Sequence, residues 1–201
     1  MKEKTRQFKN YILMIIAIIF ISAAAFIKNT YTLTKDYAIT IHGTSNLHEW
    51  DEKVEIVSGN AEVIWNTDKS FDLNKIDIRF NVKSIISEEG SIMNHNTYKA
   101  LKADNNPDII FTLTNPIEAI KLEAHEKSFT VKANLTIAGV TKPIDMQVHL
   151  FMEERRKMTF EGSKKIKMTD YGIEPPTALL GTLKTGDEVT IHFKTNFMVS
   201  N

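Results

Sequence analysis

The sequence of 201 residues contains no cysteine. Disulfides, thiolate zinc sites, cysteine nucleophiles and lipidation at a bacterial lipobox cysteine are therefore excluded. The chain also has no excess charge, because 25 basic residues balance 25 acidic ones. Five of the basic residues and one acidic residue fall in positions 1–30, which leaves 20 basic and 24 acidic residues in the rest, a net charge of −4. That charge argues against a general polyanion binder, so we expect no nucleic-acid partner.

Catalytic and metal-binding motifs are absent as well. No G-x-S-x-G, P-loop or H-E-x-x-H pattern occurs, and the six histidines are scattered, with His42 and His48 alone lying near each other. We expect surface or loop-packing roles for the histidines; a ligand or metal role for that pair is the alternative. Asp170, Asp187 and Glu188 share a loop region, but nothing else brings them together. We therefore assign no catalytic residue and no metal site, and expect a non-enzymatic protein.

One long hydrophobic run lies near the N-terminus. Basic residues in Met1–Asn10 precede the uncharged run Tyr11–Ile27, and Ala23 and Ala25 give a small-x-small cleavage pattern. These features are typical of a secretory signal. An uncleaved anchor is the alternative, because about 17 apolar residues can just span a bilayer. Residues 1–25 are thus predicted to be a signal peptide or a membrane anchor, and residues 31–201 a domain outside the cytoplasm.

Beyond that run, apolar and polar residues alternate with the period of half-buried strands. No repeat or low-complexity tract suggests a second domain. Residues 91–103 read as a helical insertion with Ile92, Tyr98 and Leu101 on one side, and residues 170–188 as a long structured loop. Eight or nine antiparallel strands are predicted, at 39–41, 54–56, 61–65, 76–82, 109–113, 129–137, 144–150, 158–160 and 189–199.

Many strands and little helix predict an all-β sandwich or barrel, and the length of several runs favours a barrel of about eight strands. Such a barrel is filled by side chains or holds one small ligand. Because the inward positions are apolar, any cavity is expected to be apolar too. Its predicted lining is Phe80, Phe111, Phe129, Val131, Leu135, Ile137, Phe160, Phe193 and Phe197.

Several segments, taken together in order, resemble the YceI-like lipid/polyisoprenoid-binding family over Tyr31 to Val199. They are Phe80–Ile85, Met93–Lys102, Pro107–Phe111, Leu135–Pro143 and Lys167–Ile173 followed by Thr185–Val189. The resemblance implies a lipocalin-like antiparallel barrel in the bacterial periplasm that binds an isoprenoid chain, without agreed catalytic residues. It implies no cofactor, with an isoprenoid lipid or quinone as the bound molecule and the membrane surface as a further partner.

The resemblance also indicates where a lipid head group would bind. Asn94, His95 and Tyr98 of the helical insertion, with Asp170 and Tyr171, are the predicted contacts at the barrel mouth. Two segments depart from the commonest family pattern. The helical segment reads His95-Asn96-Thr97-Tyr98-Lys99-Ala100-Leu101 where an Arg-Asp-x-His-Leu-like signature is usual, and the first strand carries His42 to Trp50. Both departures concern the identity of the ligand more than the fold.

Two other kinds of protein fit the same composition. A ligand-free β-domain, serving protein interaction or envelope stress, predicts a barrel filled by its own side chains. An enzyme acting on a lipid or sugar predicts a polar cluster inside the barrel, which the uniformly apolar inward positions disfavour. Trp50, in a polar neighbourhood, is expected to cap one end of the core; a binding edge or membrane interface is its alternative role.

Overall fold

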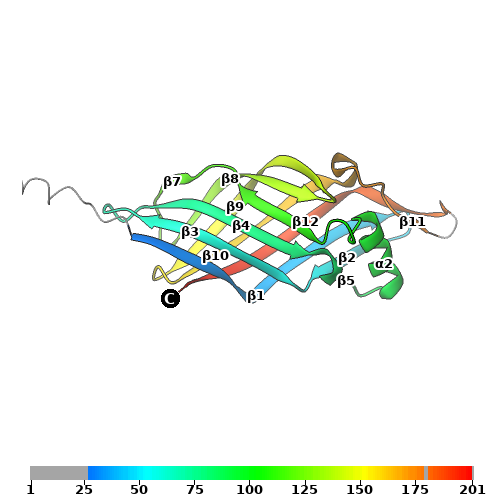
Figure 1. The fold of residues 1–201 in the computed structure, drawn as a ribbon, viewed down its shortest axis with the longest axis horizontal. Helices are drawn as coiled ribbons and strands as arrows, with labels where there is room; N and C mark the ends of the chain where they lie inside the picture. Colours follow the sequence, from blue (N-terminus) through cyan, green and yellow to red (C-terminus); the bar gives the residue numbers. More distant parts are fainter. Residues whose placement is uncertain (1–26, 179–180, 201) are drawn as a thin grey trace, which may run out of the picture.

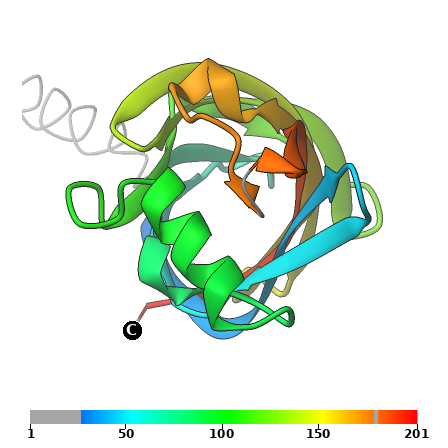
Figure 2. The same ribbon diagram turned by 90° about the vertical axis from the view of Figure 1, so that its right-hand side faces the viewer.

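Eight antiparallel strands close into a barrel in the computed structural model, which describes residues 27–178 and 181–200 (Figures 1 and 2). Strand β1 closes the ring, because it pairs with β3 over Ile27–Thr32 and with β12 over Tyr31–Ser45. The predicted all-β antiparallel barrel is confirmed. Around the ring the strands are β1 (Ile27–Ser45), β12 (Leu183–Val199), β10 (Lys157–Lys167), β9 (Val140–Glu153), β8 (Glu126–Ile137), β6 (Asp108–Leu113), β4 (Phe71–Asn81) and β3 (Val57–Trp65).

Short elements decorate the ring and distinguish its two ends. Strand β7 (Ile117–Ile120) pairs with β4, and two 3-10 turns span Val82–Ser84 and Met168–Tyr171. The end on the right of Figure 1 carries the others, and we call it the mouth. These are β2 (Glu49–Val54), which pairs with β1, β5 (Ile85–Ser87), which pairs with β2, β11 (Thr177–Ala178), which pairs with β12, and helix α2 (Ser91–Ala100).

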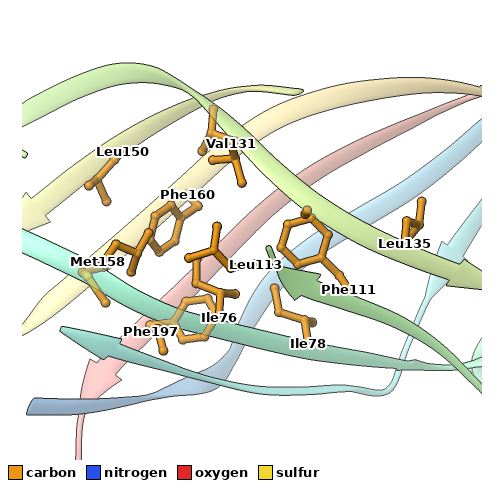
Figure 3. Packing of buried hydrophobic residues seen from close by; sticks show 14 of the residues in the cluster. Ile76, Ile78, Phe111, Leu113, Val131, Leu135, Leu150, Met158, Phe160 and Phe197 are labelled. Carbon is orange, nitrogen blue, oxygen red and sulfur yellow. The ribbon is translucent and has the colours of Figure 1, made fainter. Parts of the chain in front are cut away.

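Period-two alternation builds the core, because successive side chains of a strand point to opposite faces of the sheet. On β8, Val131, Ala133 and Leu135 are buried inside the barrel, while Lys132 between them is exposed. Figure 3 shows the labelled side chains of β4, β6, β8, β10 and β12 converging on the barrel interior. Burial of these apolar surfaces is the main source of the fold's stability.

The end of the barrel opposite the mouth is sealed by side chains, and we call it the closed end. Phe71, Leu73 and Met158 are fully buried there. The Tyr31 hydroxyl donates a hydrogen bond of 2.6 Å to the carbonyl of Arg155, in the turn between β9 and β10. The Arg155 guanidinium also lies 4.3 Å from the centre of the Trp65 ring, a cation–π distance.

The structure differs from the sequence prediction at three places. Ile56 lies in no strand and is 61% exposed, because the chain passes there from β2 to β3. The predicted loop 170–188 is shorter, because β12 begins at Leu183 and Thr185 already pairs with Ser45 of β1. Helix α2 ends at Ala100, earlier than predicted, and Ile92 at its start is 78% exposed rather than packed.

The predicted signal or anchor, residues 1–25, lies outside the described residues. Among the described residues, no helix has both the length and the hydropathy that crossing a membrane requires.

Candidate functional site

The barrel holds an apolar cavity of about 110 Å³, here called the inner cavity. Its wall exposes only apolar atoms, although Lys164 and Thr195 belong to it. Lys164 Nζ donates a hydrogen bond of 2.7 Å to the carbonyl of Asp145, so its ammonium is engaged with backbone. The rest of the wall consists of Ile39, Ile41, Val54, Ile76, Ile78, Phe80, Ile109, Phe111, Val131, Leu135, Ile144, Met146, Val148, Phe160, Ile191, Phe193 and Phe197.

A second cavity of about 90 Å³, the mouth cavity, adjoins the first. Ile41, Ile109 and Ile191 belong to both walls, so these three side chains stand between the two spaces. Along β12 the two walls run from Thr185 to Phe197. Twelve residues at about 3.3 Å each, on a strand tilted by about 40°, correspond to about 30 Å along the barrel axis.

Helix α2 presents one face to the mouth cavity. Met93, Asn96, Thr97 and Ala100 contribute to the wall, at the three- and four-residue spacing of a single helix face. Two bonds from β5 fix the orientation of the helix. The Tyr98 hydroxyl donates to the carbonyl of Ile85, and Asn94 Oδ1 accepts from the amide of Ser87, each over 2.8 Å.

A carboxyl group is buried in the wall of the mouth cavity. Strand β2 alternates so that Trp50, Glu52 and Val54 face inward, and Glu52 is only 2% exposed. The Thr97 hydroxyl donates a hydrogen bond of 2.6 Å to Glu52 Oε1. Burial raises the pKa of Glu52 to about 6; the bond from Thr97 opposes that rise, and the charge of Glu89 adds to it.

The second oxygen of this carboxyl group faces the cavity. Among the described residues, Glu52 Oε2 accepts no hydrogen bond. Among these residues, no buried side-chain oxygen that is inaccessible to solvent lacks a hydrogen-bond partner. Oε2 therefore keeps access to the mouth cavity, whose wall includes Glu52.

Trp50 forms another part of this wall and depends on a glycine. Its ring lies directly against Gly43 of β1, where a Cβ would overlap three atoms of the indole. The indole Nε1 donates a hydrogen bond of 3.1 Å to the carbonyl of Thr44. Trp50 is buried and also lines the mouth cavity. Its position therefore fits both a cap on one end of the core and a place on the wall of a candidate binding site.

The predicted apolar lining is found largely on the two cavity walls. Ile137 belongs to the mouth cavity, and Phe129 packs half-buried against the core outside both walls. Their contact with a ligand stays a prediction. The residues on the inner cavity are Phe80, Phe111, Val131, Leu135, Phe160, Phe193 and Phe197.

The five predicted head-group residues lie near the mouth, but none belongs to either cavity wall. Asn94 and Tyr98 bind β5, while His95 and Asp170 are exposed. Tyr171 is buried in the core, and burial raises the pKa of its hydroxyl. Their role in head-group binding stays a prediction.

Sequence reasoning missed the polar residues that do reach the mouth cavity. They are the buried Glu52 with its half-buried partner Thr97, and Asn96 and Thr185 complete the polar lining. Two weak signals in the sequence point toward them without deciding their positions. One is the alternation of Trp50, Glu52 and Val54; the other is the one-face spacing of α2. The expectation of uniformly apolar inward positions was wrong at Glu52.

Several of the histidines and loop acids have local partners. His42 Nδ1 lies 2.9 Å from Asp51 Oδ1, and His48 Nε2 lies 2.6 Å from Glu89 Oε1. Asp187 accepts a 2.7 Å hydrogen bond from the Thr169 hydroxyl. In residues 27–178 and 181–200, no three histidine or acidic side chains are arranged to hold a metal ion.

Comparison with known proteins places this geometry in a family. The family model of the YceI-like domain matches residues 24–197. The chain belongs to the YceI-like family. No curated protein matches the chain. A solved polyisoprenoid binding domain from Saccharophagus degradans, implicated in plant cell wall breakdown, has a TM-score of 0.65 at 15% identity, covering 85% of this chain and 98% of its own.

Two further solved structures are similar. Burkholderia cenocepacia BcnA has a TM-score of 0.60 at 16% identity, with 80% of this chain and 95% of that chain covered. The Campylobacter jejuni YCEI protein has a TM-score of 0.53 at 19% identity, with 75% and 84% covered. At such identities the likeness establishes a shared fold.

Proposed function

We propose that this YceI-like protein is an exported binding protein that holds an isoprenoid or similar long-chain lipid in its barrel, as a carrier or a store. The observation that carries the proposal is the pair of adjoining cavities, whose largely apolar walls extend about 30 Å from the mouth. Family membership supports it, as does the similarity to a structure described as a polyisoprenoid binding domain. Export rests on the signal-like pattern of residues 1–25.

The energetics of such a carrier favour a lipid that comes from a membrane. Burial of each CH₂ is worth about 0.8 kcal/mol relative to water, so a tail of some tens of carbons would exceed the ceiling of about 18–21 kcal/mol for non-covalent binding. Transfer from a bilayer into an apolar barrel is instead close to neutral. The tail then contributes little net free energy to the transfer, and the polar residues at the mouth determine which lipid is selected.

A bound tail must widen the cavities. An apolar cavity of about 150 Å³ holds one benzene molecule, and neither cavity here reaches that volume. Ile41, Ile109 and Ile191 separate the two spaces, so a tail that occupies both must move these side chains. Rotation of these three side chains would join the two spaces.

Exposed apolar residues at the mouth fit a membrane surface. Leu47 is 74% exposed in the turn between β1 and β2, and Ile92 is 78% exposed in the first turn of α2. The His48–Glu89 contact of 2.6 Å joins the two segments that carry them. We infer that Leu47 and Ile92 insert into the bilayer interface, so that the mouth opens toward the lipid source.

Two observations separate this function from its rivals. A ligand-free interaction domain predicts a barrel filled by its own side chains, whereas two adjoining spaces of about 110 and 90 Å³ remain between the mouth and the closed end. An enzyme requires a reacting group with an adjacent acid or base. Among the described residues, the one hydrogen-bond partner of the Glu52 carboxyl group is the Thr97 hydroxyl, so we propose that the site binds a ligand and catalyses no reaction.

Native mass spectrometry of the full chain, expressed in a bacterium and recovered from each cell fraction, tests the proposal. We expect a periplasmic or membrane-attached protein with one long-chain lipid bound and identifiable after organic extraction. Leu135→Trp fills the inner cavity and should abolish the bound mass, whereas Ile56→Trp, at an exposed site, should keep it. A protein that is empty, and that takes up neither a quinone nor a polyprenol from vesicles, would favour the interaction domain.

A further inference from the structure

The mouth cavity contains an acceptor without a donor. Only 2% of Glu52 is exposed, and Thr97 donates a hydrogen bond to only one of its two carboxyl oxygens. A carboxylate is an acceptor-only group, and a buried acceptor that lacks a donor is costly. The free oxygen therefore favours a ligand that brings an O–H or N–H group to this point.

The surroundings also exclude one kind of head group. The described wall of the mouth cavity contains no lysine, arginine or histidine. The one cation on the inner cavity wall, Lys164, is bonded to the carbonyl of Asp145. A phosphate placed beside Glu52 would thus face a like charge with no cation to compensate it. The wall's other polar groups, Asn96 and Thr185, are neutral.

We propose that Glu52, held by Thr97, is the head-group site of the barrel, and that the lipid bound there carries an uncharged hydrogen-bond donor, such as an alcohol or phenol, instead of a phosphate. This inference rests on the proposed lipid-binding function. The carboxylate oxygen accepts the ligand's proton donor, and Thr97 keeps the other oxygen in place. The apolar tail runs from this point past Ile41 and Ile191 into the inner cavity.

A competition experiment with two lipids of the same tail tests the proposal. Vesicles containing equal amounts of farnesol and farnesyl phosphate are mixed with the full-length protein, and the ratio of the bound species is measured by native mass spectrometry. The same vesicles are offered to Glu52→Gln and Glu49→Gln. Because all three proteins draw on one lipid pool, differences in partitioning cancel. Glu49 lies on the same strand with its side chain exposed, so its variant is a matched control.

The native protein and Glu49→Gln should prefer the alcohol. Loss of a hydrogen bond to a charged group, together with loss of the repulsion, should lower that preference by about tenfold or more in Glu52→Gln. Thr97→Val should weaken farnesol binding while the protein stays folded by circular dichroism. Binding of both lipids with an unchanged ratio in Glu52→Gln, or a native preference for the phosphate, would overturn the head-group site and leave lipid binding intact. Failure to bind either lipid would overturn the proposed function, and this site with it.

Discussion

Replacement of Glu52 by glutamine should stabilise the protein at neutral pH and have no such effect in acid. The unfolded carboxyl has a pKa of 4.5, and burial in the folded state raises it to about 6. A difference of about 1.5 pKa units corresponds to about 2 kcal/mol of unfolding free energy. Glutamine carries no charge to desolvate, and its carbonyl oxygen can still accept the hydrogen bond from Thr97.

The sign of the effect follows from the order of ionisation. Below pH 4.5 the carboxyl is protonated in both states, so its ionisation costs the folded protein nothing. Between pH 4.5 and about 6 the unfolded state loses its proton first, and the stability contributed by the protonated folded form is lost. Above that window the native protein bears the full penalty of about 2 kcal/mol, which Glu52→Gln escapes.

Urea unfolding followed by tryptophan fluorescence, at several pH values from 4 to 8, measures this difference. Carboxyl groups whose pKa is lowered on folding change the unfolding free energy at lower pH. Their effect has the opposite sign, because they stabilise the folded state when they are ionised. Asp68 is one example, because hydrogen bonds from Ser70 and Lys121 lower its pKa to about 2. Their contributions cancel when the variant is compared with the native protein at each pH. A difference in unfolding free energy that does not change between pH 4 and 8 would refute the reasoning.

Three further predictions concern other parts of the barrel. Gly43→Ala should displace the Trp50 ring and cost about 1–3 kcal/mol of unfolding free energy, seen as a shifted tryptophan emission; unchanged emission and stability would contradict the close packing. Phe71→Ala, at the closed end, should cost about 3–5 kcal/mol in urea unfolding, and a cost below 1 kcal/mol would mean that this end is not tightly packed. Leu47→Asp with Ile92→Asp should slow lipid transfer between vesicles while leaving the amount bound at equilibrium unchanged, and unaltered transfer would exclude insertion at the mouth.

The barrel could be predicted from the sequence because apolar and polar residues alternate over long stretches of its strands. Phe129 to Ile137 on β8 and Val189 to Val199 on β12 show the period of two over long runs, and both are strands in the structure. The prediction of a strand at Ile56 was wrong, because a spacing of two positions between apolar residues is not specific to strands and also occurs where a chain turns. The start of β12 at Leu183 was missed because Gly186 and its polar neighbours resemble a loop, while pairing with β1 and β11 keeps the segment extended.

The polar part of the candidate site could not be predicted in the same way. Thr97 reaches the cavity because Tyr98 and Asn94 bind β5 and thereby rotate α2, and these are contacts between segments that local sequence does not reveal. Glu52 belongs to a strand of six residues whose outward positions are Glu49, Asp51 and Lys53. A charged inward residue in such a strand is hard to tell from its neighbours until the partner on α2 is known.

The placement of Glu52 bears on how a lipid would lie in the barrel. Glu52 pairs with Ile41, and Ile41 pairs with Ile191 of β12, so the carboxyl lies near the level of Ile191. From Ile191 to Phe197, at the floor of the inner cavity, six strand residues correspond to about 15 Å along the barrel axis. A head group held by Glu52 therefore leaves room for a short straight tail above the sealed closed end. A longer isoprenoid would have to fold back toward the mouth cavity, whose mostly apolar wall would receive it beside the head group. In the proposed complex, a carboxyl group buried at this level fixes which end of the lipid lies at the mouth.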